Sequence, residues 1–202
     1  MGWKPDYIDV PAIKGYLRIP LDDTADDVEL QLWVTSASRA ADRRCKRQFG
    51  QLAAPAARTY RAPAVYNPDI GLWVLEIDDL QDPAGFTVNG VAYASSGSTL
   101  LPDNALSDGE PYIQLGLPND PGCSSAGSPV STVLVGRWGW SAVPAQVSAA
   151  VRLQCARWNF RRGAPSGVAG SPDAGSEVRL LAKLDPDVST SLTGLGRRRW
   201  PA

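Results

Sequence analysis

The chain has 202 residues, 44% of them hydrophobic, and a formal net charge of −1 at pH 7. This length suits one domain, or one core with a sizeable insertion, and the near-neutral charge excludes a global basic field for nucleic acid. Histidine is absent, which excludes the imidazole bases of serine and cysteine hydrolases and most zinc sites.

The charge is distributed unevenly along the chain. Residues 1–120 contain ten Lys and Arg against seventeen Asp and Glu, a net charge of −7, whereas residues 121–202 contain ten against four, a net of +6. We therefore expect one part of the molecule to attract an acidic partner that another part repels.

Two helices are predicted before the first strand. A short one covers residues 11–17 and stops before Ile19-Pro20, because the residue preceding a proline is disfavoured in the α region. The long one covers residues 25–49, with Thr24 as its N-cap and Gly50 at its end. Its apolar stripe recurs at helical spacing. The stripe consists of Leu30, Trp33, Val34, Ala37, Ala41 and Cys45.

Arg39, Arg43 and Lys46 align on the face of this helix opposite the apolar stripe. Such a face can follow a phosphate backbone. It can also be a solvated face whose cations suit the negative end of the helix dipole. No aromatic residues are interleaved with these positions, so the solvated face is favoured.

From residue 58 to 137 the pattern changes to short alternating strands separated by loops rich in Gly, Ser, Pro and Asp. Strands are expected over 72–77, 112–115 and 132–135. A hairpin is expected over 86–93, where Asn89-Gly90 suits the two φ > 0 positions of a type I′ turn. We expect the four apolar side chains of this hairpin to share one buried face. They are Phe86, Val88, Val91 and Tyr93.

A Trp-Gly-Trp corner, with Trp138 and Trp140, leads into the last long helix, predicted over 144–162 with Pro144 at its first position. The corner predicts packed tryptophans rather than a sugar-stacking surface. Exposure of both rings would reverse that interpretation.

The 144–162 helix has two apolar faces. One contains Val147, Val151, Cys155 and Trp158, and the nearly opposite one contains Ala149, Leu153, Ala156 and Phe160. A surface helix needs only one apolar stripe, so this helix is expected to be covered from both sides. We expect the 25–49 helix to cover one face and a neighbouring subunit to cover the other. The predicted subunit interface comprises Leu153, Ala156, Phe160, Val28 and Leu32.

Residues 164–202 are predicted to be a flexible linker and a docking arm, with apolar and basic residues at the end of a polar tether. The predicted docking residues are Leu180, Leu181, Leu184, Val188, Leu192, Arg197, Arg198, Arg199 and Trp200. The alternative prediction, a tail folded back on its own domain, is supported as well as the docking arm. Residues 1–57 and 138–163 then form a helical core, 58–137 a β insertion, and the fold class is α+β.

No catalytic, cofactor or metal site is predicted, and an enzyme is not expected. The aspartates at 22, 23, 26 and 27, and those at 78, 79 and 82, lack EF-hand spacing. The first group is explained by helix capping and the second by a solvated turn. Cys45 and Cys155 are expected to be buried thiols. The odd cysteine count, with no secretion signal and no run of transmembrane length, suits a reducing compartment.

Four segments of the chain, in this order and spacing, are similar to segments of a known family. They are Gly15–Pro20 with the acidic run Asp22–Asp27, the helix pattern Ala37–Phe49, Trp138–Pro144 opening a helix that ends at Arg161-Arg162-Gly163, and Asp185–Val188. On these segments the chain resembles the head-to-tail connector (adaptor) proteins of long-tailed bacteriophages. The β insertion is less typical of that family.

The resemblance implies a structural protein of the virion neck, assembled in the host cytoplasm. It implies a ring, usually of twelve subunits, beneath the portal protein, which extends the DNA channel and receives the next neck or tail-completion protein. Double-stranded DNA would pass without sequence-specific binding, along an acidic wall formed by Asp22, Asp23, Asp26 and Asp27. Two other hypotheses are a nucleic-acid-binding module using the basic face of the 25–49 helix and a carbohydrate-binding module on the β unit.

Overall fold

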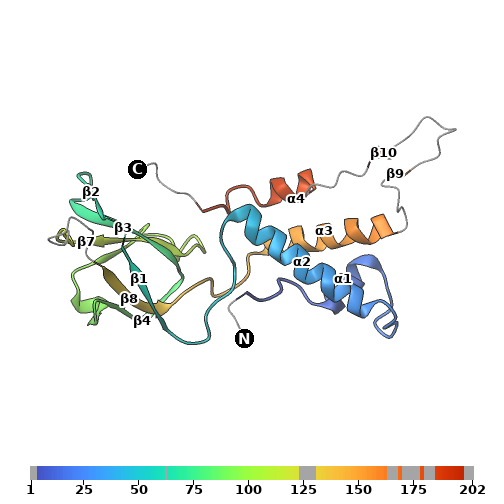
Figure 1. The fold of residues 1–202 in the computed structure, drawn as a ribbon, viewed down its shortest axis with the longest axis horizontal. Coiled ribbons are helices and arrows are strands. Elements are labelled where there is room, and N and C mark those ends of the chain that lie inside the picture. Colours follow the sequence, from blue (N-terminus) through green and yellow to red (C-terminus); the bar gives the residue numbers. More distant parts are fainter. Residues whose placement is uncertain are drawn as a thin grey trace. The chain divides into compact units, whose positions relative to one another are not determined.

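The computed structural model describes residues 4–61, 63–122, 131–162, 168–169, 178–179 and 185–197. The fold is α+β, and the chain divides into two compact units (Figure 1). The β unit consists of Lys4 and Gly50–Ala142, and the helical unit of Pro5–Phe49 with the described part of Val143–Ala202. The β unit therefore includes the Trp138 to Trp140 corner, which the sequence assigned to the helical core.

The helical unit begins with two helices, α1 (Val10–Leu17) and α2 (Asp27–Cys45). The Asp9 side chain caps α1 by accepting the Ala12 N–H at 2.9 Å. The expected cap of α2 is wrong, because Asp26 occupies the N-cap position and makes no side-chain capping bond. The expected end at Gly50 is also wrong: Lys46, with φ 53°, takes the left-handed conformation that ends α2.

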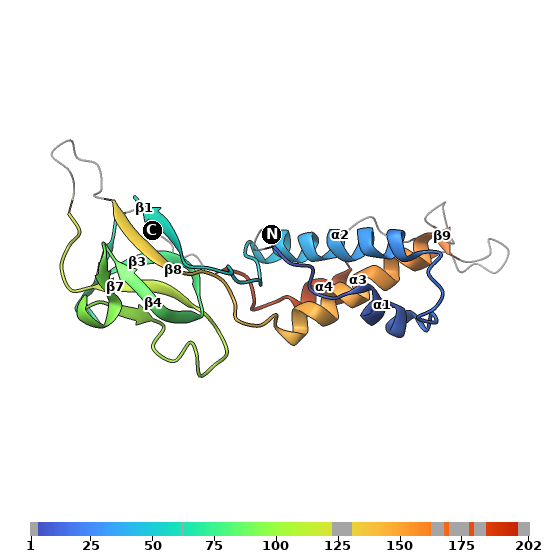
Figure 2. The ribbon, with the colours of Figure 1, turned by 90° about the horizontal axis from the view of Figure 1, so that it is seen from below.

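The other helices of this unit are α3 (Ala145–Arg162) and α4 (Pro186–Ser191). Pro144 lies one residue before α3, and its carbonyl accepts the N–H groups of Val147 and Ser148 at 3.0 and 3.3 Å. The short strands β9 (Val168–Ala169) and β10 (Val178–Arg179) pair with each other. Within the unit, α2 packs mainly on α3, α1 contacts both, and α4 packs on α3 (Figure 2).

The β unit contains two four-stranded antiparallel sheets. The first has the order β1-β8-β4-β5 and the second the order β2-β3-β7-β6. The strands are β1 (Ala56–Tyr60), β2 (Val65–Asn67), β3 (Leu72–Leu80), β4 (Asp82–Val88), β5 (Val91–Ala92), β6 (Thr99–Leu101), β7 (Tyr112–Leu117) and β8 (Thr132–Arg137). A short 3-10 helix, η1 (Tyr93–Ser95), follows β5.

The hairpin between β4 and β5 has the predicted turn, with Asn89 at φ 50° and Gly90 at φ 80°, and pairs Val88 with Val91. The expectation of one shared buried face is wrong at Val91, which is 47% exposed, whereas Phe86 and Val88 are buried. The β5 strand is two residues long and lies at the edge of its sheet. Among the described strands, none pairs with β5 on its outer side.

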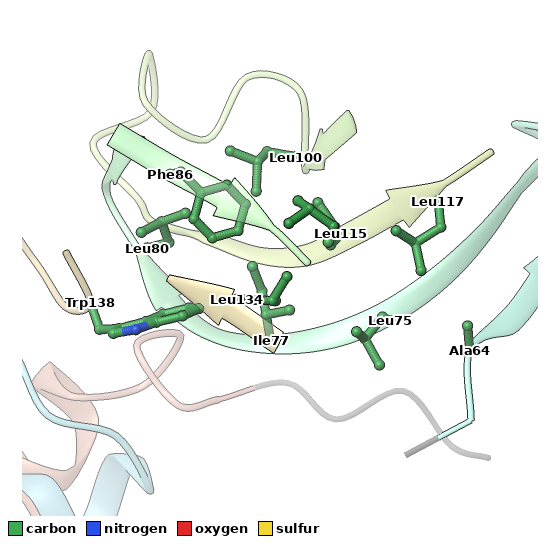
Figure 3. Close-up of a cluster of buried hydrophobic side chains, with 11 residues drawn as sticks. Ala64, Leu75, Ile77, Leu80, Phe86, Leu100, Leu115, Leu117, Leu134 and Trp138 are labelled. Carbon is green, nitrogen blue, oxygen red and sulfur yellow. The ribbon is translucent and has the colours of Figure 1, made fainter. Parts of the chain in front are cut away.

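The core of the β unit lies between β3, β4, β7 and β8 (Figure 3). Its large, fully buried side chains include Leu75, Ile77, Leu80, Phe86, Leu115, Leu134 and Trp138. The corner is fixed by Gly139, at φ 110°, whose N–H donates to the Asp79 carbonyl at 2.7 Å and whose carbonyl accepts the Gln81 N–H at 3.1 Å. The interior of this unit is thus filled by its own chain.

Candidate subunit-contact surfaces

Helix α2 carries a second apolar surface outside its packed stripe. Its buried side chains, among them Leu30, Val34 and Ala41, follow one face. Val28 and Leu32 lie four residues apart on the nearly opposite face and are 78% and 60% exposed. At about 100° per residue the two side chains are neighbours on the helix surface. We call Val28 and Leu32 the α2 strip.

Helix α3 repeats this arrangement. Its fully buried side chains include Val147, Val151 and Cys155. Nearly opposite them lie Ala149, Leu153 and Phe160, which we call the α3 strip. Ala149 is exposed, Leu153 is half-buried, and Phe160 is 74% exposed.

Ala156 does not belong to that exposed surface, although the sequence placed it in the predicted interface. It is 4% exposed in the single chain, so its side chain is already covered before any partner binds. The expectation that Ala156 presents apolar area to a neighbouring subunit is therefore wrong. The other four predicted interface residues, Val28, Leu32, Leu153 and Phe160, retain accessible surface.

The charges around the two strips have opposite signs. The first half of α2 carries Asp27 and Glu29, with Asp26 at its N-cap. Helix α3 has no acidic residue in its sequence, and its charged residues are Arg152, Arg157, Arg161 and Arg162. Asp26, Asp27, Arg157 and Arg162 are ion-paired inside the helical unit. Among the described residues, Glu29 near the α2 strip and Arg152 and Arg161 on α3 make no ion pair.

Part of the acidic group has a structural role inside the helical unit. The Lys14 ammonium group is buried, pairs with Asp27 at 2.5 Å and donates to the Asp23 and Leu21 carbonyls at 2.7 and 3.3 Å. Asp26 pairs with Arg162 at 2.7 Å. Lys14 thus ties the segment between α1 and α2 to both helices. Asp22 and Glu29 make no ion pair with the residues that the structure describes.

The described part of the predicted docking arm folds back on its own unit. Val188 and Leu192 are 2% and 1% exposed. Arg44 Nε donates to Ser189 Oγ at 3.0 Å, and the Arg197 N–H donates to the Cys45 carbonyl at 2.9 Å. The prediction that Val188, Leu192 and Arg197 belong to a free arm is therefore wrong. Leu180, Leu181, Leu184, Arg198, Arg199 and Trp200 lie outside the described residues.

An ion pair between a buried carboxylate and a partly exposed arginine secures this segment. The Asp185 side chain is fully buried, pairs with Arg157 Nε and accepts the Asp187 N–H at 2.7 Å. The Asp185 N–H donates to Gln154 Oε1 at 3.3 Å. The carboxylate thus both caps α4 and joins it to α3.

One residue of the basic face of α2, Arg39, is used for contacts within the helical unit. Arg39 pairs with Asp42, donates to the Pro5 carbonyl and lies over the Tyr7 ring, 5.5 Å from its centroid. Lys46 is exposed at the helix end, as is Arg43. Arg39 therefore holds the N-terminal segment and is engaged within the unit, whereas Arg43 and Lys46 remain accessible.

The tryptophan corner is buried, as the sequence predicted. Trp138 and Trp140 are 0% and 3% exposed. Their indole N–H groups donate to the Ala56 carbonyl at 2.8 Å and to Asp79 Oδ2 at 3.0 Å. A sugar-stacking surface on these two rings is excluded because neither ring is accessible.

The assignment of the second aspartate group to a solvated turn is also wrong. Asp78 and Asp79 belong to β3, where Asp78 pairs with Arg58 and Asp79 is 8% exposed. Asp82 begins β4 and pairs with Arg137 at 3.5 Å. These carboxylates are partners of cations and of an indole rather than ligands left open for a metal.

A groove that the sequence did not indicate lies on the helical unit. It has a volume of about 570 Å³ and is open to solvent; its lining includes Asp6, Tyr7, Gln31 and Arg152. Gln31 Nε2 donates to Asp6 Oδ2 at 2.7 Å, and the Tyr7 hydroxyl donates to Asp42 and accepts the Phe49 N–H. Burial and Asp42 raise the pKa of Tyr7 above its ordinary value. The Tyr7 hydroxyl in this groove is therefore hydrogen-bonded and stays protonated at neutral pH.

The two described thiols are poor nucleophiles. Cys45 and Cys155 are free and buried, and burial raises the pKa of Cys155 to about 12 and also raises that of Cys45. Both therefore stay protonated at neutral pH. Among the described residues no group of three potential metal ligands gathers, and no described helix has the length and apolar character needed to cross a bilayer.

Comparison with known proteins does not assign this chain to a family. No family model matches the chain, and neither does any curated protein. Among solved structures, a chain from "Neck of native GTA particle computed with C12 symmetry" is 22% identical; the match covers 92% of this chain and 97% of that chain, with a TM-score of 0.37. That TM-score is too low for an argument about the fold or the role of this chain.

Proposed function

We propose that this chain is a structural, non-catalytic subunit of the head-to-tail connector of a bacteriophage, acting as a ring in the virion neck. The exposure of Val28, Leu32 and Phe160 carries the proposal. These large apolar side chains lie on helices whose other faces are already packed. Exposed apolar area of this kind is typical of surfaces that another protein covers.

The sequence supports this assignment independently of the geometry. The four segments that resemble connector proteins include the second half of α2, the whole of α3 and the start of α4. The complete absence of histidine and the protonated state of the buried thiols are in keeping with an assembly role. In the proposed role the ring contains identical subunits, twelve by resemblance, and contacts the portal protein and the next neck or tail-completion protein.

Passage of double-stranded DNA through the ring is part of the same proposal. Of the four aspartates suggested for the channel wall, Asp26 and Asp27 are paired with Arg162 and Lys14. Asp22 and Asp23 are exposed and remain the candidates for repelling the phosphate backbone. Changing both to asparagine should slow DNA ejection, and unchanged DNA retention and ejection would remove them from the channel wall.

The test of the proposed function is the mass of the assembled chain. Native mass spectrometry of the purified protein, alone and mixed with head particles made without this chain, should show one closed multiple of the subunit mass. A single-copy mass under both conditions would contradict the proposed function. The free protein and the mixture should be measured at the same ionic strength, because charge-bordered contacts weaken in salt.

A further inference from the structure

We propose that neighbouring copies contact each other head to tail, with the α3 strip of one copy packed on the α2 strip of the next. This inference rests on the proposed function, since it names the partner of the exposed helical surfaces as a second copy of the chain. It assigns two different surfaces to the contact. A pairing of unlike surfaces can close a ring, whereas a pairing of one surface with itself gives a dimer.

The directions of the two strips support this pairing. α2 and α3 pack on each other, so their buried faces point inward. Each strip lies nearly opposite the buried face of its own helix, and the two strips therefore face away from each other across the helical unit. Figure 2 shows α2 along the upper edge of that unit, with α1 and most of α3 below it. One copy can thus use both strips at once, which a ring requires.

Charge complementarity identifies a second copy as the occupant. Glu29, beside Val28, is exposed and has no ion pair among the described residues, although its charge also acts on Arg162 of the same copy. Arg161, beside Phe160, also has no ion pair in the described part of the chain. When the α3 strip meets the α2 strip, Arg161 of one copy can oppose Glu29 of the next beside an apolar centre. If either strip met its own equivalent, charges of one sign would oppose each other.

The apolar residues of the strips would form only the centre of the contact. A stable interface covers roughly 800 Å² on each partner, with an apolar core and a polar rim. Val28 and Leu32 on one side and Leu153 and Phe160 on the other fit that core. The surrounding charged residues fit the rim, where they set the pairing of unlike surfaces more than its strength.

The experiment uses two variants of the full chain, each with one strip altered. The α2-strip variant is Val28→Gln with Leu32→Gln, and the α3-strip variant is Phe160→Gln with Arg161→Glu. Glutamine and glutamate suit helices and the altered apolar side chains are mostly exposed, so both variants should keep the fold, which circular dichroism checks. The matched control is Val65→Gln, an apolar residue of the β unit that is 65% exposed.

The variants are studied under the condition in which the wild-type chain assembles. Each strip variant alone should stay a single copy, and the Val65→Gln control should assemble like the wild type. An equimolar mixture of the two strip variants, distinguished by mass, should give a heterodimer that grows no further, because only one intact strip of each kind remains to pair. A heterodimer that stops growing would show that the contact joins two different surfaces.

Other outcomes overturn the inference in distinguishable ways. If both strip variants form the wild-type assembly, the strips are not the subunit contact, although the proposed function stands. If both variants form the wild-type assembly but fail to bind head particles, the strips serve a different partner. If one variant assembles normally while the other does not, one surface pairs with itself. A wild-type chain that never assembles would overturn the proposed function together with this inference.

Discussion

The two units of the molecule use their large apolar side chains differently. The β unit encloses a cluster of eleven buried residues, and its exposed apolar residues lie mostly on edges and loops, between 38% and 50% exposed apart from Val65. In the helical unit, Leu21, Val28, Leu32 and Phe160 are 60% to 78% exposed. The β unit thus completes its own core, whereas the helical unit leaves apolar surface for something else to cover.

The largest expected effect comes from the corner of the β unit. A Cβ at Gly139 would lie 1.9 Å from the Gly50 carbonyl oxygen and 2.9 Å from Gln51 Cα, at φ 110°. Both neighbours are backbone, so they cannot move aside. We expect Gly139→Ala to lower the free energy of unfolding of the β unit by about 4 kcal/mol or more.

Hydrogen exchange measured by mass spectrometry tests this loss, because it follows the peptides of each unit separately. The control is Gly71→Ala, also at positive φ (67°) but with open space around the added carbon. It should cost only about 1 kcal/mol, the strain of the left-handed conformation alone. Equal effects of the two substitutions would show that the close approach at Gly139 is unimportant.

One chemical change made in both units sharpens the comparison. Phe86 is 2% exposed in the β unit and Phe160 is 74% exposed on α3. Phe86→Ala should lower the free energy of unfolding of its unit by about 3–4 kcal/mol, since it opens a cavity between the sheets. Phe160→Ala should change that of the helical unit by less than about 0.5 kcal/mol. Urea titration of each variant, read by hydrogen exchange, measures both. A large loss at Phe160 in the single chain would mean that it is part of a core after all.

Local signals in the sequence predicted the elements that depend on neighbouring residues. The Asn89-Gly90 turn and the two-sided character of α3 follow from the left-handed tendency of Asn-Gly and from helical spacing. The ends of α2 did not follow, because a lysine rather than a glycine takes the left-handed position at residue 46. Short-range preferences favour a cap but do not require one.

Contacts between distant residues were the part that the sequence did not reveal. Asp79 is buried because the Trp140 indole, 61 residues away, donates to it. α4 packs against the helical unit because Arg44 and Arg157 reach it from α2 and α3. In the sequence, nothing links Arg44 and Arg157 to each other or to the aspartate that precedes Pro186. The same pattern suits a free arm, so the choice between arm and folded-back tail needed the structure.

The attachment of α4 is open to a smaller and more local test. Asp185→Ala removes both the cap of α4 and the partner of Arg157, and should cost about 2 kcal/mol. Asp185→Asn retains a good capping side chain and removes only the charge, so it should cost about half as much. The loss should appear as faster amide exchange in residues 187–192, with exchange in the β unit unchanged. Equal protection in all three proteins would show that Val188 and Leu192 alone hold the segment.

The smallest expected effect is a gain of stability in the helical unit. Lys46 ends α2 at φ 53°, a conformation that costs most residues about 1 kcal/mol and glycine almost nothing. The Lys46 side chain is exposed, so Lys46→Gly should raise the free energy of unfolding of the helical unit by about 0.5–1 kcal/mol, through relief of strain at the helix end. Lys46→Ala, which has a Cβ but no charge, is the matched control and should give no gain. Urea titration read on α2 peptides measures the difference. If alanine stabilises as much as glycine, the gain comes from removing a charge beside Arg43 and Arg44 rather than from the backbone.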